Sequence, residues 1–166
     1  TTSHSGNLAT IARKELMEDL ESKTVSGFCV MTTVRSAKLT FANVHLEPGK
    51  SGAFKRLQML NTIKHQTPDG GLVVVGDTNM RNSEEESLEP IGLMGERPPK
   101  PTWNSRINRF REDGRRYSTY YTRYLHCRRV AIDEVKVWDE PVDQNGKKFY
   151  LSDHFALSGR ARVKVL

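Results

Sequence analysis

Polar side chains recur where the apolar stretches of this sequence end. Asn43 and His45 are two residues apart, and Asp77 and Asn79 repeat that spacing directly after the apolar run 72–75. Residues two apart on an extended chain project to the same side, so each pair would present its side chains together. Burying such groups is costly unless they are paired or bind a metal. Three further residues share this kind of position: Asp133, Asp153 and His154.

These residue types suit the hydrolysis of a phosphodiester. That reaction needs a divalent cation, a base for the attacking water, and cationic or hydrogen-bonding groups for the phosphoryl oxygens. Magnesium prefers carboxylate and amide oxygens. A carboxylate can also orient water, and a histidine can stabilise or protonate developing charge.

The charge of the chain favours a polyanionic partner. Its 26 Lys and Arg outnumber its 20 Asp and Glu, which gives a net charge of +6. Residues 97–129 are rich in arginine, hold only two acidic residues, and include four tyrosines. Arginine matches phosphate and aromatic rings stack on bases, so this segment predicts nucleic-acid binding, with a basic surface loop as the alternative. We expect three arginines to contact the substrate here: Arg115, Arg116 and Arg123.

Composition limits the remaining possibilities. A chain of 166 residues favours one domain, residues 1–166. No apolar run approaches the ~20 residues of a membrane span, so no membrane partner is expected. The two cysteines lack zinc-site spacing, and Cys29 lies in an apolar run that predicts a buried, reduced thiol. We therefore expect an intracellular protein, either nuclear or cytoplasmic. The chain begins with Thr1 rather than Met, which suggests that something upstream has been removed.

Strand signals dominate the pattern of elements, with one clear helix. The helix is predicted over 53–64, with Phe54, Leu57, Leu60 and Ile63 at helical spacing. Strands are predicted at 28–34, 38–44, 72–75, 130–137, 148–151 and 155–165, with a hairpin turn at 145–146. Residues 80–128 read as mostly irregular. The first stretch fits either a helix over 8–20 or a strand over 8–12. The fold class is therefore α+β.

Four ordered motifs resemble the endonuclease/exonuclease/phosphatase superfamily. They are Asn-Val-His-Leu-Glu at 43–47, Gly-Asp-Thr-Asn-Met-Arg at 76–81, Thr-Trp at 102–103 and Ser-Asp-His at 152–154. The resemblance implies a two-layer β-sandwich flanked by helices and magnesium-dependent hydrolysis of phosphoester bonds, with manganese as an alternative metal. The subgroup that the motifs resemble most is the 5′-tyrosyl-DNA phosphodiesterases. The resemblance therefore implies a nucleic-acid partner, with DNA favoured over RNA.

The resemblance also implies catalytic roles. Asp77 would orient or activate the attacking water, and Asn79 would hold the water and the scissile phosphate. His154 would stabilise the transition state at the phosphate, and Asp133 would orient His154. His45 matches the second histidine of the family, which binds phosphate or helps the leaving group.

Substrate and metal contacts follow from the same motifs. Arg81 and Trp103 match positions that contact the DNA strand beside the scissile bond, and Asn43 lies beside His45. Asp153 would assist at the metal.

Two departures from the family pattern point to an incomplete site. Ala131 stands where the family usually has an arginine, two residues before Asp133. The principal metal ligand of the family, an N-terminal Glu preceded by an active-site Asn, has no match here. We therefore expect the C-terminal portion of a catalytic domain, without its N-terminal strands and completed by a missing segment or a partner chain. The alternatives are a related nuclease, of abasic-site endonuclease or deadenylase type, and a catalytically silent nucleic-acid-binding module.

Overall fold

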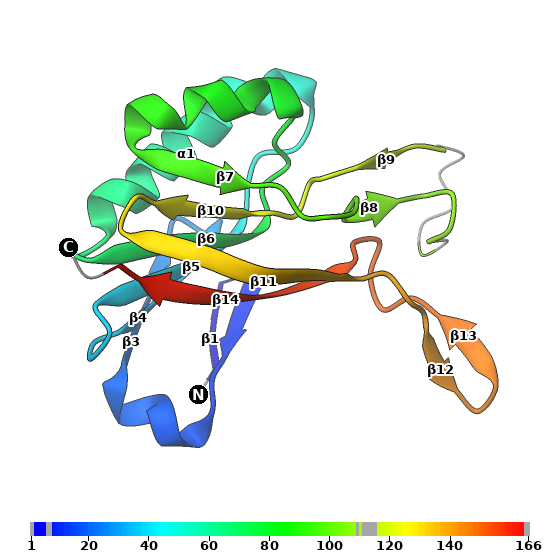
Figure 1. Cartoon of the computed structure of the whole chain (residues 1–166), viewed down its shortest axis with the longest axis horizontal. Coiled ribbons are helices and arrows are strands. Elements are labelled where there is room, and N and C mark those ends of the chain that lie inside the picture. Colours follow the sequence, from blue (N-terminus) through cyan, green and yellow to red (C-terminus); the bar gives the residue numbers. More distant parts are fainter. Residues whose placement is uncertain (1, 6–7, 109, 111–115, 165–166) are drawn as a thin grey trace.

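A six-stranded mixed sheet forms the centre of the molecule. The computed structural model describes residues 2–5, 8–108, 110 and 116–164. The sheet has the order β3-β4-β5-β6-β10-β7. Its strands are β3 (Leu20–Val25), β4 (Cys29–Val34), β5 (Leu39–His45), β6 (Gly71–Asp77), β7 (Leu93–Glu96) and β10 (Tyr124–Cys127). Figure 1 shows this sheet between the helices and a second layer of strands.

The predicted hairpin and helix organise the centre of this sheet. β4 and β5 pair antiparallel, as the two apolar runs and their short polar turn predicted. The chain then crosses through α1 (Ala53–Gln66) and returns as β6, which pairs parallel with β5. A helical crossover is the usual connection between parallel strands. As a result, the carboxyl ends of β5 and β6 lie side by side, with His45 in register with Asp77.

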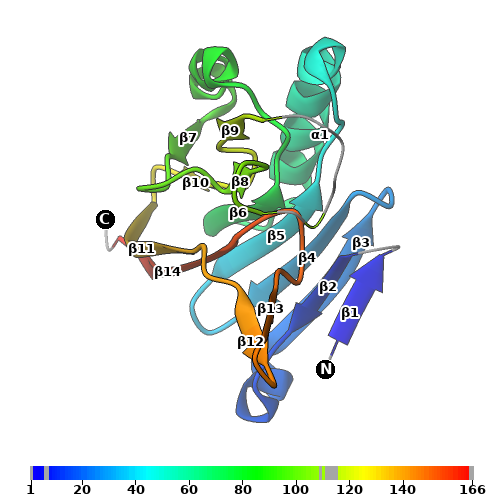
Figure 2. The same cartoon turned by 90° about the vertical axis from the view of Figure 1, so that its right-hand side faces the viewer.

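Alternating residues of the sheet build a core on each face. On one face, Leu72 and Val74 pack with Leu60 and Ile63 of α1. On the other, Val73 packs with side chains of β11 (Val130–Trp138) and β14 (Ala156–Val163). β11 and β14 form an antiparallel pair. Figure 2 gives a second view of the β11–β14 pair, which lies beside β10 and β6. This mixed α+β architecture agrees with the fold class that the sequence predicted.

Smaller elements surround the two layers. The β1–β2 hairpin lies beside β3, β4 and β5, and β12–β13 projects at the far end (Figures 1 and 2). The bounds are β1 (Thr2–Ser5), β2 (Leu8–Ile11), β8 (Trp103–Asn104), β9 (Ser118–Thr119), β12 (Val142–Gln144) and β13 (Lys147–Phe149). The short 3-10 helices are η1 (Lys14–Asp19), η2 (Lys50–Gly52), η3 (Asn82–Ser87) and η4 (Glu89–Ile91).

Several elements differ from the sequence prediction. The ambiguous first stretch divides into β2, η1 and the start of β3. The segment 80–128 contributes β7 and β10 to the main sheet and is therefore more regular than predicted. In α1, Phe54 is 72% exposed whereas Arg56 is buried, which reverses the predicted apolar face at the start of the helix. In the part of the chain that is described, no helix is long and apolar enough to span a membrane.

Candidate active site

The carboxyl ends of β5 and β6 place His45 beside Asp77. Gly76 makes their close approach possible, because a Cβ atom at this position would lie 2.3 Å from the carbonyl oxygen of Val44. Its φ of +115° also favours glycine. The sequence Gly-Asp thus lets the end of β6 lie directly against β5.

Asp77 lies between two histidines. Its Oδ2 is 3.4 Å from Nε2 of His154 and 3.7 Å from Nε2 of His45. Its Oδ1 accepts a hydrogen bond of 3.0 Å from the backbone N–H of Asn79, in a turn typical of aspartate. The Asn79 amide in turn donates to the carbonyl oxygen of Leu46, 3.0 Å away. These contacts hold Asp77 in one orientation at the end of its strand.

Thr102 and Thr122 position His154 from the other side. The Oγ1 of Thr122 lies 2.9 Å from Nδ1 of His154. The buried Thr102 accepts a hydrogen bond from the Thr122 N–H at its Oγ1 (2.9 Å) and one from the Phe155 N–H at its carbonyl oxygen (2.7 Å). One residue therefore joins the two segments that carry Thr122 and His154.

A cleft of about 500 Å³ opens over these residues. One wall is aromatic: the ring centroids of Trp103 and Tyr117 are 4.5 Å apart, and Tyr121 lies 6.2 Å from Trp103. Arg81 donates to the Tyr121 hydroxyl (2.6 Å) and lies over its ring. Burial raises the pKa of Tyr121, the hydrogen bond with Tyr117 adds to this, and the Arg81 charge opposes it. The wall thus sets three rings beside a cation, with Trp103 and Tyr121 buried and Tyr117 half-buried.

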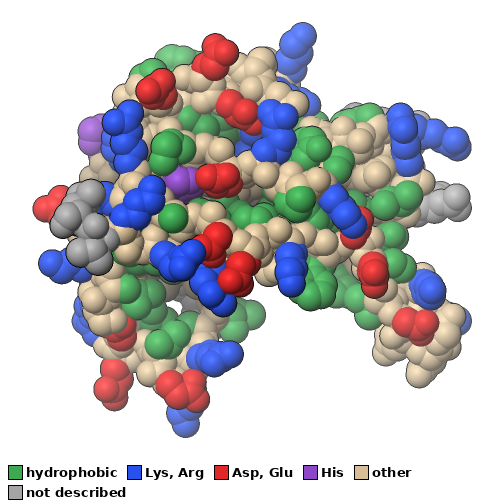
Figure 3. Space-filling model, viewed as in Figure 1, with side chains coloured by type: hydrophobic (Ala, Val, Ile, Leu, Met, Phe, Trp, Pro, Cys, Tyr) green, Lys and Arg blue, Asp and Glu red, His purple; other side chains and the backbone are tan. Residues whose placement is uncertain are grey.

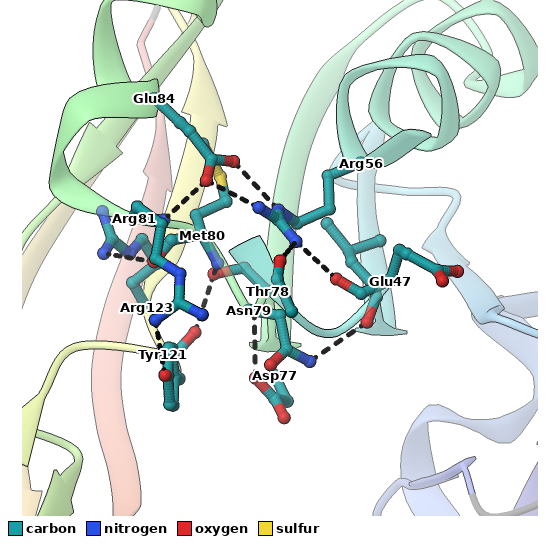
Figure 4. Close-up of polar contacts among 12 residues, drawn as sticks. Glu47, Arg56, Asp77, Thr78, Asn79, Met80, Arg81, Glu84, Tyr121 and Arg123 are labelled. Carbon is teal, nitrogen blue, oxygen red and sulfur yellow. Dashed lines mark hydrogen bonds and ion pairs between the residues drawn. The ribbon is translucent and has the colours of Figure 1, made fainter. Parts of the chain in front are cut away.

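Two buried arginines fix the loops at the rim of the cleft. Arg56 donates to both carboxylate oxygens of Glu84, at 2.9 and 2.6 Å, and to the carbonyl oxygens of Glu47 and Gly49, at 2.6 and 2.8 Å. The same Glu84 accepts from the backbone N–H of Arg81 (3.1 Å). Figure 4 shows Arg56 reaching from its helix to both loops. The loops at 47–49 and 81–84 are thus held by one guanidinium.

Arg123 performs a similar task behind the aromatic wall. It is 1% exposed, pairs with Glu85 at 2.7 Å, and also donates to the Tyr120 carbonyl oxygen at 2.9 Å. Burial lowers the pKa of Arg123, and the Glu85 carboxylate opposes this. The sequence predicted that Arg123 contacts substrate. In the structure its guanidinium is instead buried and bonded within the protein interior.

The structure brings most of the predicted site residues together. Eight of them line the same cleft: Asn43, His45, Asp77, Asn79, Arg81, Trp103, Asp153 and His154. The Asn43 amide donates to the carbonyl oxygen of Ala9 in β2. Asp133 is placed differently, because it pairs with Arg162 of β14, while Thr122 contacts the histidine that Asp133 was expected to orient. Arg116 is exposed, and Arg115 lies outside the described residues.

Thr122 was missed at the sequence level, because only the folded chain brings its hydroxyl to His154. The Arg-Tyr composition around 117–123 signalled an aromatic and cationic surface, to which Tyr117 and Tyr121 belong. The burial of Arg56 was not predicted, because the apolar residues at helical spacing indicated a different buried face.

Charge on the face that carries β11 and β14 is balanced. Figure 3 shows Lys and Arg side chains interleaved with Asp and Glu on this face. Arg160 pairs with Glu134, and Arg162 with Asp133. This face therefore offers no continuous basic surface among the described residues.

The described residues do not contain a complete metal site. Within the described residues, no three His, Cys, Asp or Glu side chains are grouped so that they could hold an ion. Asp153 lines the cleft as a single carboxylate close to the Asp77–His154 pair. Its oxygen chemistry suits magnesium, but the donor set of these residues does not complete a site.

Comparisons with known proteins place the fold. No protein-family model matches the sequence, and a comparison with curated proteins finds no match either. The structure resembles that of D. rerio TDP2 complexed with a single-strand DNA product, with a TM-score of 0.62 and 19% identity over 81% of this chain and 60% of that one. It also resembles truncated Caenorhabditis elegans TDP2, with a TM-score of 0.59 and 16% identity over 88% and 67% of the two chains.

A third neighbour decides the fold. It is an endonuclease/exonuclease/phosphatase family protein from Bacteroides thetaiotaomicron, with a TM-score of 0.60 and 13% identity over 83% of this chain and 56% of that one. The chain has the endonuclease/exonuclease/phosphatase fold. The chain spans 60% of the length of the D. rerio protein that it matches.

Proposed function

We propose that this chain carries part of the active site of a metal-dependent phosphodiesterase that acts on nucleic acid. The observation that carries the proposal is the convergence of Asp77, His45 and His154 in one cleft, on strand ends that an apolar core holds in place. In this proposal Asp77 orients the attacking water molecule. The two histidines can donate hydrogen bonds to phosphoryl oxygens.

The cofactor that we propose is magnesium, with manganese as an alternative. A divalent ion would polarise the phosphoryl group in such a site. Because the described residues do not complete a donor set, the principal ligand would come from a further segment or a partner chain. Exposed apolar side chains support such a covering segment: Leu151 is 72% exposed and Trp138 is 62% exposed.

The substrate class that we propose is DNA, with 5′-phosphotyrosyl ends as the specific substrate. The aromatic wall and Arg81 support a nucleic acid, because rings can stack on bases and a guanidinium matches phosphate. The neighbour from D. rerio, TDP2, holds a single-strand DNA product, and the motifs resemble the tyrosyl-DNA subgroup. A related nuclease of abasic-site or deadenylase type is the alternative within the same chemistry.

Turnover of defined substrates by the wild-type chain and two variants tests this proposal. The substrates are oligonucleotides with a 5′-phosphotyrosyl end, an abasic site or a 3′ poly(A) tail, each with Mg²⁺. We expect Asp77→Asn and His154→Ala to abolish cleavage of the 5′-phosphotyrosyl substrate while DNA binding survives. Cleavage of only another substrate would replace the specific proposal with that nuclease activity.

A silent binding module is the second candidate, and the incomplete donor set favours it. It predicts DNA binding without turnover by the wild-type chain. Repeating the assay with Mg²⁺ and with Mn²⁺ separates the two: cleavage of any of the three substrates supports the enzyme, and DNA binding without cleavage supports the binding module.

A further inference from the structure

His154 contacts a hydroxyl on one ring nitrogen and a carboxylate on the other. Its Nε2 is 3.4 Å from Oδ2 of Asp77, and its Nδ1 is 2.9 Å from Oγ1 of Thr122. A carboxylate can only accept hydrogen bonds, so Nε2 must carry a proton to contact it favourably. In a neutral ring Nδ1 is then an acceptor, and the Thr122 hydroxyl can donate to it.

The Thr122 hydroxyl can either donate or accept a hydrogen bond at Nδ1, whereas a carboxylate can only accept one. A carboxylate at the position of Thr122 could contact Nδ1 only if that nitrogen also carried a proton, which would make the ring a cation between two anions. The hydroxyl can instead bond Nδ1 whichever of the two carries the hydrogen, because it is both donor and acceptor. The ring is then held with Nε2 on the side of Asp77, 3.4 Å from Oδ2.

The backbone on both sides of Thr122 is held in place. The carbonyl oxygen of Tyr121 accepts from the N–H and the hydroxyl of Thr78, at 3.0 and 2.7 Å. The Thr122 N–H donates to Thr102, and the adjacent Arg123 is ion-paired in the interior. The hydroxyl therefore meets His154 from a rigid position, on the side lined by a second hollow of about 480 Å³.

We infer that Thr122 is a positioning residue, which fixes the ring orientation of His154 through a hydrogen bond between its hydroxyl and Nδ1. The inference deepens the proposed function, since it assigns the group that prepares His154 to donate from Nε2 to a phosphoryl oxygen. It replaces the role that the sequence suggested for Asp133, which pairs with Arg162.

Three variants test Thr122. Thr122→Val removes the hydroxyl at nearly constant shape, Thr122→Ser keeps it, and Thr119→Val removes a nearby hydroxyl on β9 as a control. The ¹⁵N resonance of His154 Nδ1, assigned with a His154→Gln variant, is measured for each. We expect that resonance to move in Thr122→Val and to stay near its wild-type position in Thr122→Ser and in the control. An unmoved resonance in Thr122→Val would overturn the inference.

Kinetics provide the second readout. With the 5′-phosphotyrosyl oligonucleotide and Mg²⁺, we expect Thr122→Val to lower kcat by about tenfold to a hundredfold with little change in KM, as misplacement of a reacting group does. Thr122→Ser should recover most of that loss, and a Ser variant as impaired as the Val variant would count against the inference. A wild-type chain that binds DNA without turnover favours the silent binding module over the enzyme, whereas the resonance still decides the role of Thr122.

Discussion

Replacing Arg56 with Met should strongly destabilise the protein and disturb the rim of the cleft. The guanidinium is 1% exposed and makes four hydrogen bonds, two to the carboxylate of Glu84 and two to backbone carbonyl oxygens. Removing it leaves Glu84, whose side chain is 12% exposed, as a nearly buried charge with the Arg81 N–H as a remaining donor. Loss of one partner of a buried ion pair costs about 3–5 kcal/mol.

That cost is large beside the stability of a typical domain. Folded domains are stable by about 5–15 kcal/mol. For a chain of this size each 1 kcal/mol lowers the Tm by about 2–4 °C, so Arg56→Met should lower it by about 10 °C. Urea unfolding followed by tryptophan fluorescence measures the free energy of unfolding directly.

Two further variants decide whether the buried charge is the cause. Lys55→Met removes the neighbouring but exposed ion pair with Glu47, and should cost at most about 1 kcal/mol. Adding Glu84→Gln to Arg56→Met removes the orphaned charge and should recover about 1 kcal/mol or more. A loss of less than about 1 kcal/mol for Arg56→Met, equal to that of Lys55→Met, would refute the reasoning.

Three other predictions follow from local geometry and charge. Gly76→Ala should cost about 1–3 kcal/mol of unfolding free energy, because its Cβ would meet the Val44 carbonyl oxygen; a loss below about 0.5 kcal/mol would contradict the close approach. Burial raises the pKa of the Cys29 thiol to about 12, so its neutral form stabilises the fold at lower pH. This contribution should be lost as pH rises from about 9 toward the folded pKa, more in wild type than in Cys29→Ala, and parallel pH profiles would refute it. Replacing Arg115 and Arg116 with Ala should weaken DNA binding and flatten its salt dependence by up to about 0.7 per arginine on a single strand; an unchanged salt slope would exclude those contacts.

Local sequence patterns predicted the centre of the fold and most of the residues that line the cleft. The apolar run Leu72–Val75 and the hairpin before it form from residues that are close in the sequence. As expected, His45 ends β5 and Asp77 ends β6. The motifs at 43–47, 76–81, 102–103 and 152–154 marked the cleft because each one ends or begins a buried segment. Local hydrophobic patterns are therefore sufficient to predict those strands and strand ends that the apolar core holds in place.

Features that depend on distant partners could not be predicted in this way. Arg56 is buried and Phe54 exposed because Glu84, 28 positions away in the sequence, neutralises the guanidinium. The strand β10 was overlooked because its residues Tyr124–Cys127 follow a polar, arginine-rich segment. Likewise, nothing in the local sequence distinguishes the Thr122 hydroxyl from any other until His154 is brought against it.

The rate of single-turnover cleavage in H₂¹⁸O tests the central claim most directly. The claim is that the cleft at Asp77 directs water onto a phosphodiester. With enzyme in excess over a 5′-phosphotyrosyl oligonucleotide and Mg²⁺, the account predicts one ¹⁸O atom in the product phosphate for wild type and a rate at least about 10²-fold lower for Asp77→Asn. Equal rates in the two proteins, or product phosphate without ¹⁸O, would contradict it.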